Sequence, residues 1–217
     1  MLTLLPGQDK SDPAIGCIAP KTVALTYDDG PDDVITAQVM AAALAQNPKI
    51  PLIFFEVGSN ISARPPVSVS VNNNGFLIGD HTWDHPSAIG LSDALVTQEA
   101  TTAAAEIKTV TGRNPRFLRP PYGDYTAAAM KDWYNLGMYV VTWDIDSNDW
   151  MDPGNADAAY NNVEAAFLED THSGHIILCH DVHTACKDAL PRIVTLFQSY
   201  GYRFVSLDEC LNIAPYK

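Results

Sequence analysis

The chain has 217 residues, of which 47% are hydrophobic and 18% are charged, a composition typical of a globular domain. Its 13 Lys and Arg against 26 Asp and Glu give a net charge of −13, which argues against a nucleic-acid partner because counterion release requires a basic surface. No apolar run is long enough to cross a bilayer, so we expect no membrane span. A neutral or cationic substrate is easier to reconcile with this charge.

Strands and helices are predicted to alternate after an irregular lead-in. Residues 1–21 contain several Pro and Gly residues, which predicts no regular element there. Apolar patterns predict a buried strand over 23–27, a helix over 35–45 and a second buried strand over 52–55. The segment 58–75 is polar, contains two consecutive Pro residues and ends in three Asn and a Gly, so it is predicted to form loops and turns.

The second half of the chain continues the same alternation. We predict strands over 76–79, 116–119, 138–143, 175–178 and 203–205, and helices over 92–111, 126–136, 156–168 and 187–200. About seven such units predict an α/β fold whose parallel sheet closes, or nearly closes, into a (β/α) barrel. A doubly wound open sheet is the alternative, but its dinucleotide-binding glycine pattern does not follow the first strand. We expect one catalytic domain over 22–217.

Polar side chains follow directly after several of the predicted strands. In a (β/α) barrel these positions share the catalytic face. The residues are Asp28, Asp29, His81, Arg119, Asp144 and His180. The sequence therefore predicts one reactive site built from segments that are far apart in the chain.

Two adjacent carboxylates, Asp28 and Asp29, end the first predicted strand and are followed at once by Gly30 and Pro31. Successive strand residues point to opposite sides, so the two acids can take different roles, one binding a metal and the other moving a proton. The alternative is that the pair caps the helix that begins near Asp32, because acids favour helix N-termini.

His81 and His85 are four residues apart, a spacing that places both rings on one side of a helical turn. With Asp29 they would form a set of two His and one carboxylate, which leaves a coordination position open, as in catalytic zinc sites. Because this spacing also occurs by chance on surface helices, the strand-end acids are needed to support a metal site.

Four Cys residues indicate an oxidising compartment. Cys17 and Cys210 lie near opposite ends of the chain, and we predict a disulfide between them. A bridge between Cys179 and Cys186 stays open, because Cys179 lies in a strand motif; a reduced protein with buried thiols is the alternative. Asn60 opens an N-glycosylation sequon, and we expect a secreted glycoprotein, extracellular or in the cell wall, from which any secretion signal has been trimmed.

Five motifs in order resemble those of the polysaccharide deacetylases, carbohydrate esterase family 4. They are 26–31 (TYDDGP), 81–85 (HTWDH), 119–122 (RPPY), 146–150 (DSNDW) and 177–181 (ILCHD). The resemblance extends over residues 20–210 and is closest to chitin deacetylases. It implies a distorted (β/α) barrel, a divalent metal that is usually Zn²⁺ but can be another ion such as Co²⁺, and hydrolysis of acetyl groups from a sugar polymer.

The resemblance also implies roles for the residues that match these motifs. Asp28 resembles the catalytic base, and Arg119 resembles the arginine that holds the carboxylate of that base. Asp29, His81 and His85 resemble the three metal ligands. These roles agree with the chemistry expected of each side chain, since a carboxylate can accept a proton from water and imidazole binds zinc.

Further residues are implied to complete the site. Tyr122 resembles the residue whose backbone N–H binds the oxyanion, and Trp150 and Leu178 resemble the lining of the acetyl pocket. His180 resembles the catalytic acid, and Asp149 the carboxylate that tunes it. Taken alone, His180 would be a core histidine by default, and Trp150 and Leu178 would be ordinary core residues.

The expected partner is an acetylated polysaccharide or oligosaccharide, with chitin first and peptidoglycan or acetylxylan as alternatives. A non-catalytic carbohydrate-binding module on this fold is a further alternative, but binding alone needs neither base nor acid. We expect a monomer. Two features depart from the family: Tyr27 replaces the commoner Phe, and 68–75 is polar where relatives usually have a helix, which would alter the substrate groove.

Overall fold

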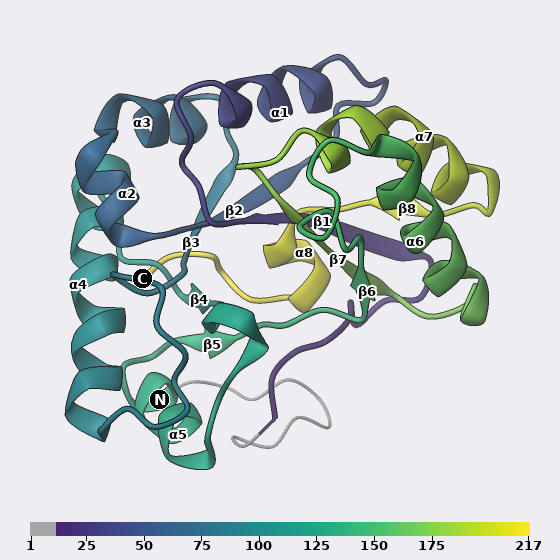
Figure 1. Ribbon diagram of the computed structural model, residues 1–217. Helices are drawn as coiled ribbons and strands as arrows, with labels where there is room; N and C mark the ends of the chain where they lie inside the picture. The colour runs from purple at the N-terminus through teal and green to yellow at the C-terminus, as the bar shows by residue number, and fades with distance from the viewer. Residues whose placement is uncertain (1–11) are drawn as a thin grey trace.

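One curled sheet of eight parallel strands lies at the centre of the computed structural model, which describes residues 12–217 (Figure 1). Seven strands follow the order β5-β4-β3-β2-β1-β7-β6, and β8 also pairs with β1. The strands are β1 (Thr22–Asp28), β2 (Leu52–Glu56), β3 (Leu77–Asp80), β4 (Phe117–Leu118), β5 (Tyr139–Val140), β6 (Ile145–Asp146), β7 (His175–His180) and β8 (Arg203–Phe204). The predicted distorted (β/α) barrel with about seven parallel strands is confirmed.

The sheet curls because its two ends are consecutive in the chain. β5 and β6 lie at opposite ends of the strand order, yet only residues 141–144 connect them. The two ends must therefore approach each other. β6 was not predicted: it contributes two residues, and its existence depends on pairing Ile145 with Ile177 of β7 rather than on a local pattern.

All helices but the last cover the outside of this sheet, and the last one packs against residues inside the curl (Figure 1). They are α1 (Ile35–Leu44), α2 (Gly58–Ala63), α3 (Pro65–Asn73), α4 (Asp93–Thr111), α5 (Ala127–Asn135), α6 (Ala156–Glu169), α7 (Ala185–Ser199) and α8 (Leu207–Leu211). The predicted boundaries of α4 are supported by its caps. The Ser92 hydroxyl accepts the Leu95 N–H, and Gly112 ends the helix in the left-handed region, at φ 75°.

The prediction of loops over 58–75 was wrong, because α2 and α3 occupy most of this segment. Pro65 and Pro66 lie in the first turn of α3, where a missing N–H costs no intrahelical hydrogen bond. Ser68 is fully buried and its hydroxyl donates to Glu56 at 2.6 Å, so tertiary contact outweighs the polar composition. A helix therefore precedes the histidine motif after all.

Alternation along β1 separates the two hydrophobic layers. Leu25 and Tyr27 pack with the helices outside the sheet, whereas Ala24 packs with Phe55 inside the curl. By the same alternation Asp28 faces the inside, where it is 3% exposed. The first motif carboxylate is thus delivered into the interior of the barrel.

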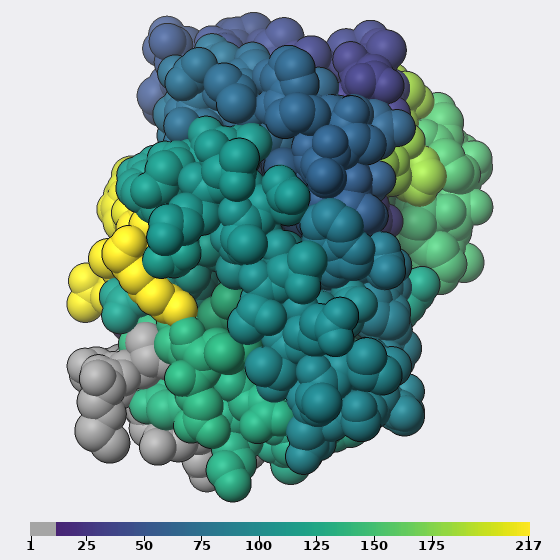
Figure 2. Space-filling model, turned by 90° about the vertical axis from the view of Figure 1, so that its left-hand side faces the viewer, coloured from purple at the N-terminus to yellow at the C-terminus, as the bar shows by residue number. Residues whose placement is uncertain are grey.

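Two disulfides close the fold. The predicted bridge between Cys17 and Cys210 is confirmed, and it ties the lead-in to α8. Cys179 and Cys186 form a second bridge, from the end of β7 to the start of α7. The C-terminal residues pair beside 114–116 through the Arg116 N–H and the Pro215 carbonyl, and Figure 2 shows this segment in yellow against the teal part of the chain. Within residues 12–217, no helix is both long enough and apolar enough to span a membrane.

Candidate active site

A cavity of about 440 Å³ opens where the central strands end. Its position follows from the parallel sheet, since every strand delivers its last residue to the same side. The side chains that line it come from all five sequence motifs: Asp28, Asp29, His81, His85, Tyr122, Trp143, Asp146, Trp150, Leu178 and His180. Most of the sequence-predicted residues are therefore brought together at one place.

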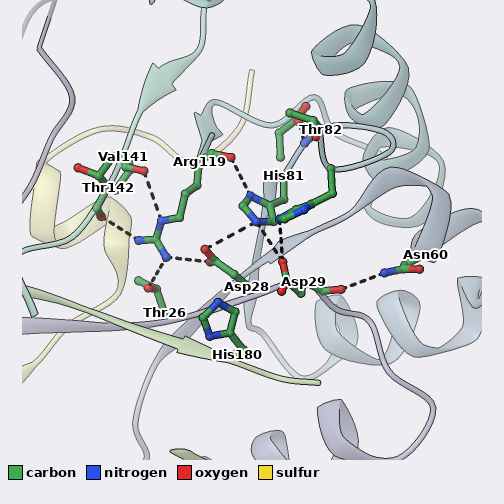
Figure 3. Close-up of polar contacts among 12 residues, drawn as sticks. Thr26, Asp28, Asp29, Asn60, His81, Thr82, Arg119, Val141, Thr142 and His180 are labelled. Atoms are coloured by element: carbon green, nitrogen blue, oxygen red, sulfur yellow. Dashed lines mark hydrogen bonds and ion pairs between the residues drawn. The ribbon is translucent and has the colours of Figure 1, made fainter. Parts of the chain in front are cut away.

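Arg119 holds Asp28 from behind the cavity (Figure 3). Its guanidinium is fully buried, and Nη1 donates to the Asp28 Oδ1 at 2.8 Å and to the Thr26 hydroxyl at 2.7 Å. Nη2 and Nε donate to the carbonyls of Thr142 and Val141 at 2.9 and 3.3 Å. With these contacts made, one carboxylate oxygen of Asp28 is fixed.

The neighbouring acid, Asp29, converges with two imidazoles. Its Oδ1 lies 3.3 Å from the His81 Nε2 and 3.1 Å from the His85 Nε2. This oxygen is buried, and although the two rings are near, none of the described groups meets the geometry of a hydrogen bond to it. Burial would raise the pKa of Asp29, but the two His side chains hold it well below its usual range. Three ligand atoms within 4.8 Å of one another, with an orphaned carboxylate oxygen among them, fit a divalent cation.

The other ring nitrogen of His81, Nδ1, makes a hydrogen bond within the protein. Nδ1 lies 2.7 Å from the Arg119 carbonyl oxygen, which requires Nδ1–H and leaves Nε2 as the free ligand atom. The expected helical turn over 81–85 was wrong, since no helix forms there. Instead Thr82 and His85 take positive φ angles of 65° and 61°, and this irregular turn brings the two rings to a centroid distance of 4.8 Å.

Helix capping at the first motif is performed by another residue. The Asp32 Oδ1 accepts the N–H groups of Val34 and Ile35 at 2.8 and 2.7 Å, at the start of α1. The capping alternative for Asp28 and Asp29 is therefore wrong.

His180 faces the cavity from the last residue of β7. The Asp149 carboxylate receives both its backbone N–H, at 2.9 Å, and its Nδ1, at 2.7 Å. Burial would lower the pKa of His180, but the hydrogen bond and charge of Asp149, with smaller contributions from Asp28 and Asp29, raise it to about 9. At neutral pH this imidazole carries a proton that it can donate through Nε2.

A sequence model of the family described as polysaccharide deacetylase matches residues 16–141, more than half of the chain. The chain belongs to the polysaccharide deacetylase family. A peptidoglycan-N-acetylglucosamine deacetylase of Listeria monocytogenes is 30% identical to this chain over 192 residues, which cover 87% of this chain and 38% of that protein. The chain thus spans less than half the length of that relative.

Two solved structures share the fold of this polysaccharide deacetylase over nearly its whole length. The chitin deacetylase of the fungal pathogen Colletotrichum lindemuthianum has a TM-score of 0.85 and 27% identity, covering 95% of this chain and 96% of that one. A peptidoglycan N-acetylglucosamine deacetylase has a TM-score of 0.86 and 27% identity, covering 94% of each chain. The chain is thus similar to enzymes named for two different polymers.

Two predicted residues of this family member, Asp144 and Tyr122, differ from the others in their position relative to the cavity. Asp144 does not reach the cavity; its carboxylate lies 2.5 Å from the Nδ1 of the buried His175 and also accepts the Ile176 N–H, at the opposite end of β7. Tyr122 reaches the cavity with its side chain 68% exposed, and its ring contacts His85 at a centroid distance of 4.7 Å. Its φ of 61° places its backbone in the left-handed region.

Sequence reasoning missed some residues of the site. Asp146 and Trp143 line the cavity, and Trp143 also lies over the Arg119 guanidinium at 5.6 Å. Asp146 stands in the fourth motif and could have been found there, whereas Trp143 only extends an apolar run. Asp181, by contrast, was not missed, because it ends the fifth motif; it is fully buried against Gly30, where any Cβ would collide with its carboxylate, and burial raises its pKa to about 7.

Proposed function

We propose that this polysaccharide deacetylase hydrolyses N-acetyl groups from N-acetylglucosamine polymers, with chitin or chitooligosaccharides as the first candidates, and releases acetate. One observation carries the proposal. A single cavity holds a buried carboxylate fixed by Arg119, a cluster of two His and one Asp that fits a metal, and a His hydrogen-bonded to the Asp149 carboxylate. A carbohydrate-binding module would have no use for the first and third of these.

Asp29, His81 and His85 would hold the cation, with Zn²⁺ as the first candidate because two imidazoles and one carboxylate suit it. When bound, such an ion supplies Lewis-acid polarisation of the acetyl carbonyl. The protein contributes the orientation of the ligands, since the Arg119 carbonyl fixes the His81 ring. Co²⁺ would satisfy the same donor set.

We assign the role of general base to Asp28. Arg119 holds its Oδ1, and its Oδ2 lies 3.8 Å from the His81 Nε2, beside the proposed metal ligands. A water attacking the acetyl carbon would give its proton to this oxygen as the new C–O bond forms. Because Arg119 is fully buried and makes four hydrogen bonds, it orients the carboxylate before substrate binds.

We assign the role of general acid to His180. Its strand partner across the β1–β7 register is Asp28, so acid and base border the same cavity. As the C–N bond breaks, the proton on His180 Nε2 passes to the leaving nitrogen, and the products are a free amine and acetate. We assign the Tyr122 backbone N–H to the oxyanion, and Trp150 and Leu178 to the acetyl methyl group.

The disulfides bear on the location of the protein, and its net charge bears on the product that it can tolerate. Two disulfides support an oxidising, extracellular or cell-wall location. A net charge of −13 would tolerate a product that becomes cationic as acetyl groups leave. We keep the assignment of one catalytic domain over 22–217, acting as a monomer on an acetylated polysaccharide.

Mass spectrometry of a defined chitooligosaccharide incubated with the zinc-loaded protein tests the proposal. We expect products lighter by one acetyl group per event, with acetate released in equal amount. Acetylxylan and peptidoglycan fragments are assayed in parallel. Faster acetate release from acetylxylan would overturn the preference for N-acetyl groups, and faster release from peptidoglycan would overturn chitin as the substrate.

A further inference from the structure

The two loops that carry the proposed metal ligands have an unusual backbone. Asp29 has a φ of 76°, and in the second loop Thr82 and His85 have φ values of 65° and 61°. Residues other than Gly rarely adopt the left-handed region, and such conformations persist where surrounding contacts hold them. The ligand positions therefore depend on whatever fixes these two loops.

The start of α2 makes those contacts. The Val57 N–H donates to the Gly30 carbonyl at 2.9 Å, and the Gly58 and Ser59 N–H groups donate to the carbonyls of Thr82 and Trp83 at 2.9 and 3.0 Å. We call residues 57–60 the ligand-loop clamp. One short segment thus contacts both loops.

The fourth contact of the ligand-loop clamp comes from a side chain. The Asn60 Nδ2 donates to the backbone carbonyl of Asp29 at 2.9 Å (Figure 3). The amide orientation is consistent on its other side, where Oδ1 lies 3.5 Å from the Arg64 Nη1 and Arg64 pairs with Asp33. A carbonyl acceptor at Asp29 and a guanidinium donor at Arg64 require this orientation of the amide.

We propose that Asn60 is a positioning residue that holds the backbone of Asp29 in its left-handed conformation and so sets the affinity of the metal site. This inference rests on the metal site proposed above. The other three contacts of the ligand-loop clamp are made by backbone N–H groups. The hydrogen bond of the Asn60 side chain is therefore the contact that a substitution can remove. Groups that orient metal ligands from outside the coordination shell typically contribute 10–100-fold to metal affinity.

The sequon at 60–62 supplies a matched control. Asn60→Ala removes both the amide donor and the sequon, whereas Ser62→Ala removes the sequon and keeps the donor, and Ser62 is exposed. Asn60→Leu retains the bulk of the side chain without the donor. Any effect of a lost glycan would appear in all three variants, and an effect of the lost hydrogen bond would appear in the two Asn60 variants alone.

The measurement is the Zn²⁺ dissociation constant, by competition with a chromophoric chelator, together with the Tm of each metal-free protein. We expect binding about 10–100-fold weaker in Asn60→Ala and Asn60→Leu, unchanged binding in Ser62→Ala, and kcat that recovers at saturating zinc. Equal Zn²⁺ affinity in all variants would overturn the proposal. So would failure of both Asn60 variants to fold while Ser62→Ala folds, because Asn60 would then be structural. If wild-type protein binds zinc but deacetylates no polymer, the proposed function fails and this inference stands.

Discussion

The half of the cavity that contains the proposed metal ligands and the proposed base differs in construction from the half that contains the proposed acid. Asp28, His81 and Arg119 come from three strand ends and are at most 3% exposed, and each is fixed by contacts from other segments. The acid half consists of His180 and Asp149, held together by two hydrogen bonds at the β6–β7 side. Loss of a proposed metal ligand in the first half should therefore remove metal and activity together, whereas substitutions in the second half should change proton transfer and leave the metal bound.

The largest effect is expected from His81→Ala in the metal half. Loss of Nε2 leaves Asp29 and His85 as the remaining ligands, so metal and activity should disappear together. Elemental analysis of the purified protein measures this. His172→Ala is the matched control, since this exposed His lies outside the cluster, and it should retain metal. Full zinc content in the His81→Ala protein would show that His81 is not a ligand.

His180→Ala should lower turnover by about 10²–10⁴-fold while zinc stays bound, because general acid catalysis is typically worth this much. The pKa of His180 is raised to about 9, so its protonated form dominates below that pH and the rate should fall as pH rises through it. A cation bound at Asp29 would offset part of the negative charge that supports this proton, so we expect the alkaline limb of kcat/KM at or below pH 9.

Asp149→Asn sharpens the same test of the acid half. It keeps the His180 imidazole but removes the charge that raises its pKa, so the alkaline limb should move to lower pH. Zinc content should be unchanged. An alkaline limb that stays in place in both variants would assign that limb to a group other than His180.

The two disulfides should separate stability from activity. Cys17–Cys210 spans 193 residues and Cys179–Cys186 spans 7, so the chain-entropy relation gives contributions of about 5 and about 2–3 kcal/mol to the free energy of unfolding. The short bridge, however, begins next to His180, and both its sulfurs lie within 4.8 Å of the Asp149 carboxylate. Removing the long bridge as an Ala pair should lower Tm more; removing the short one should lower kcat/KM more. A larger loss of kcat/KM on removal of the long bridge would contradict the expectation that the short bridge supports His180 and Asp149.

The smallest effect is expected at Tyr27, whose side chain packs with the helices outside the sheet and does not line the cavity. Its hydroxyl is fully buried and has no hydrogen-bond partner among residues 12–217, so Tyr27→Phe should raise the free energy of unfolding by about 1 kcal/mol without altering kcat. Tyr216→Phe is the matched control, because its hydroxyl accepts the Ile78 N–H and its loss should destabilise. Thermal unfolding measures both. A lower Tm for Tyr27→Phe would mean that its hydroxyl is satisfied.

The parts of the fold found from sequence are those with a local pattern. The strand-end acids, the His pair and Arg119 were identified as motif residues because each follows a recognisable apolar strand. α2 and α3 were missed because Pro65 and Pro66 suggest a loop, although both are compatible with the first turn of a helix. Composition alone does not distinguish a loop from a helix here, because the burial of Ser68, which favours the helix, is a tertiary contact.

Contacts between distant segments could not be predicted from the sequence. Asn60 was identified only as a sequon, and its hydrogen bond to the Asp29 carbonyl depends on how α2 packs against the first loop. The bridge between Cys179 and Cys186 depends on where α7 begins relative to β7. The left-handed backbone at Asp29 has no sequence signal of its own, since Asp is found in many conformations.

The most direct test of the account is Asp28→Asn, because it changes the proposed base while leaving the adjacent proposed metal ligand, Asp29, in place. Zinc content and acetate release from a chitooligosaccharide are measured on the same preparation. We predict zinc content equal to that of the wild type and turnover lower by about 10²–10⁴-fold, since the amide cannot accept the proton of the attacking water. Near-normal turnover with zinc bound would contradict the assignment of Asp28 as the base, and with it the division of roles between the two neighbouring carboxylates.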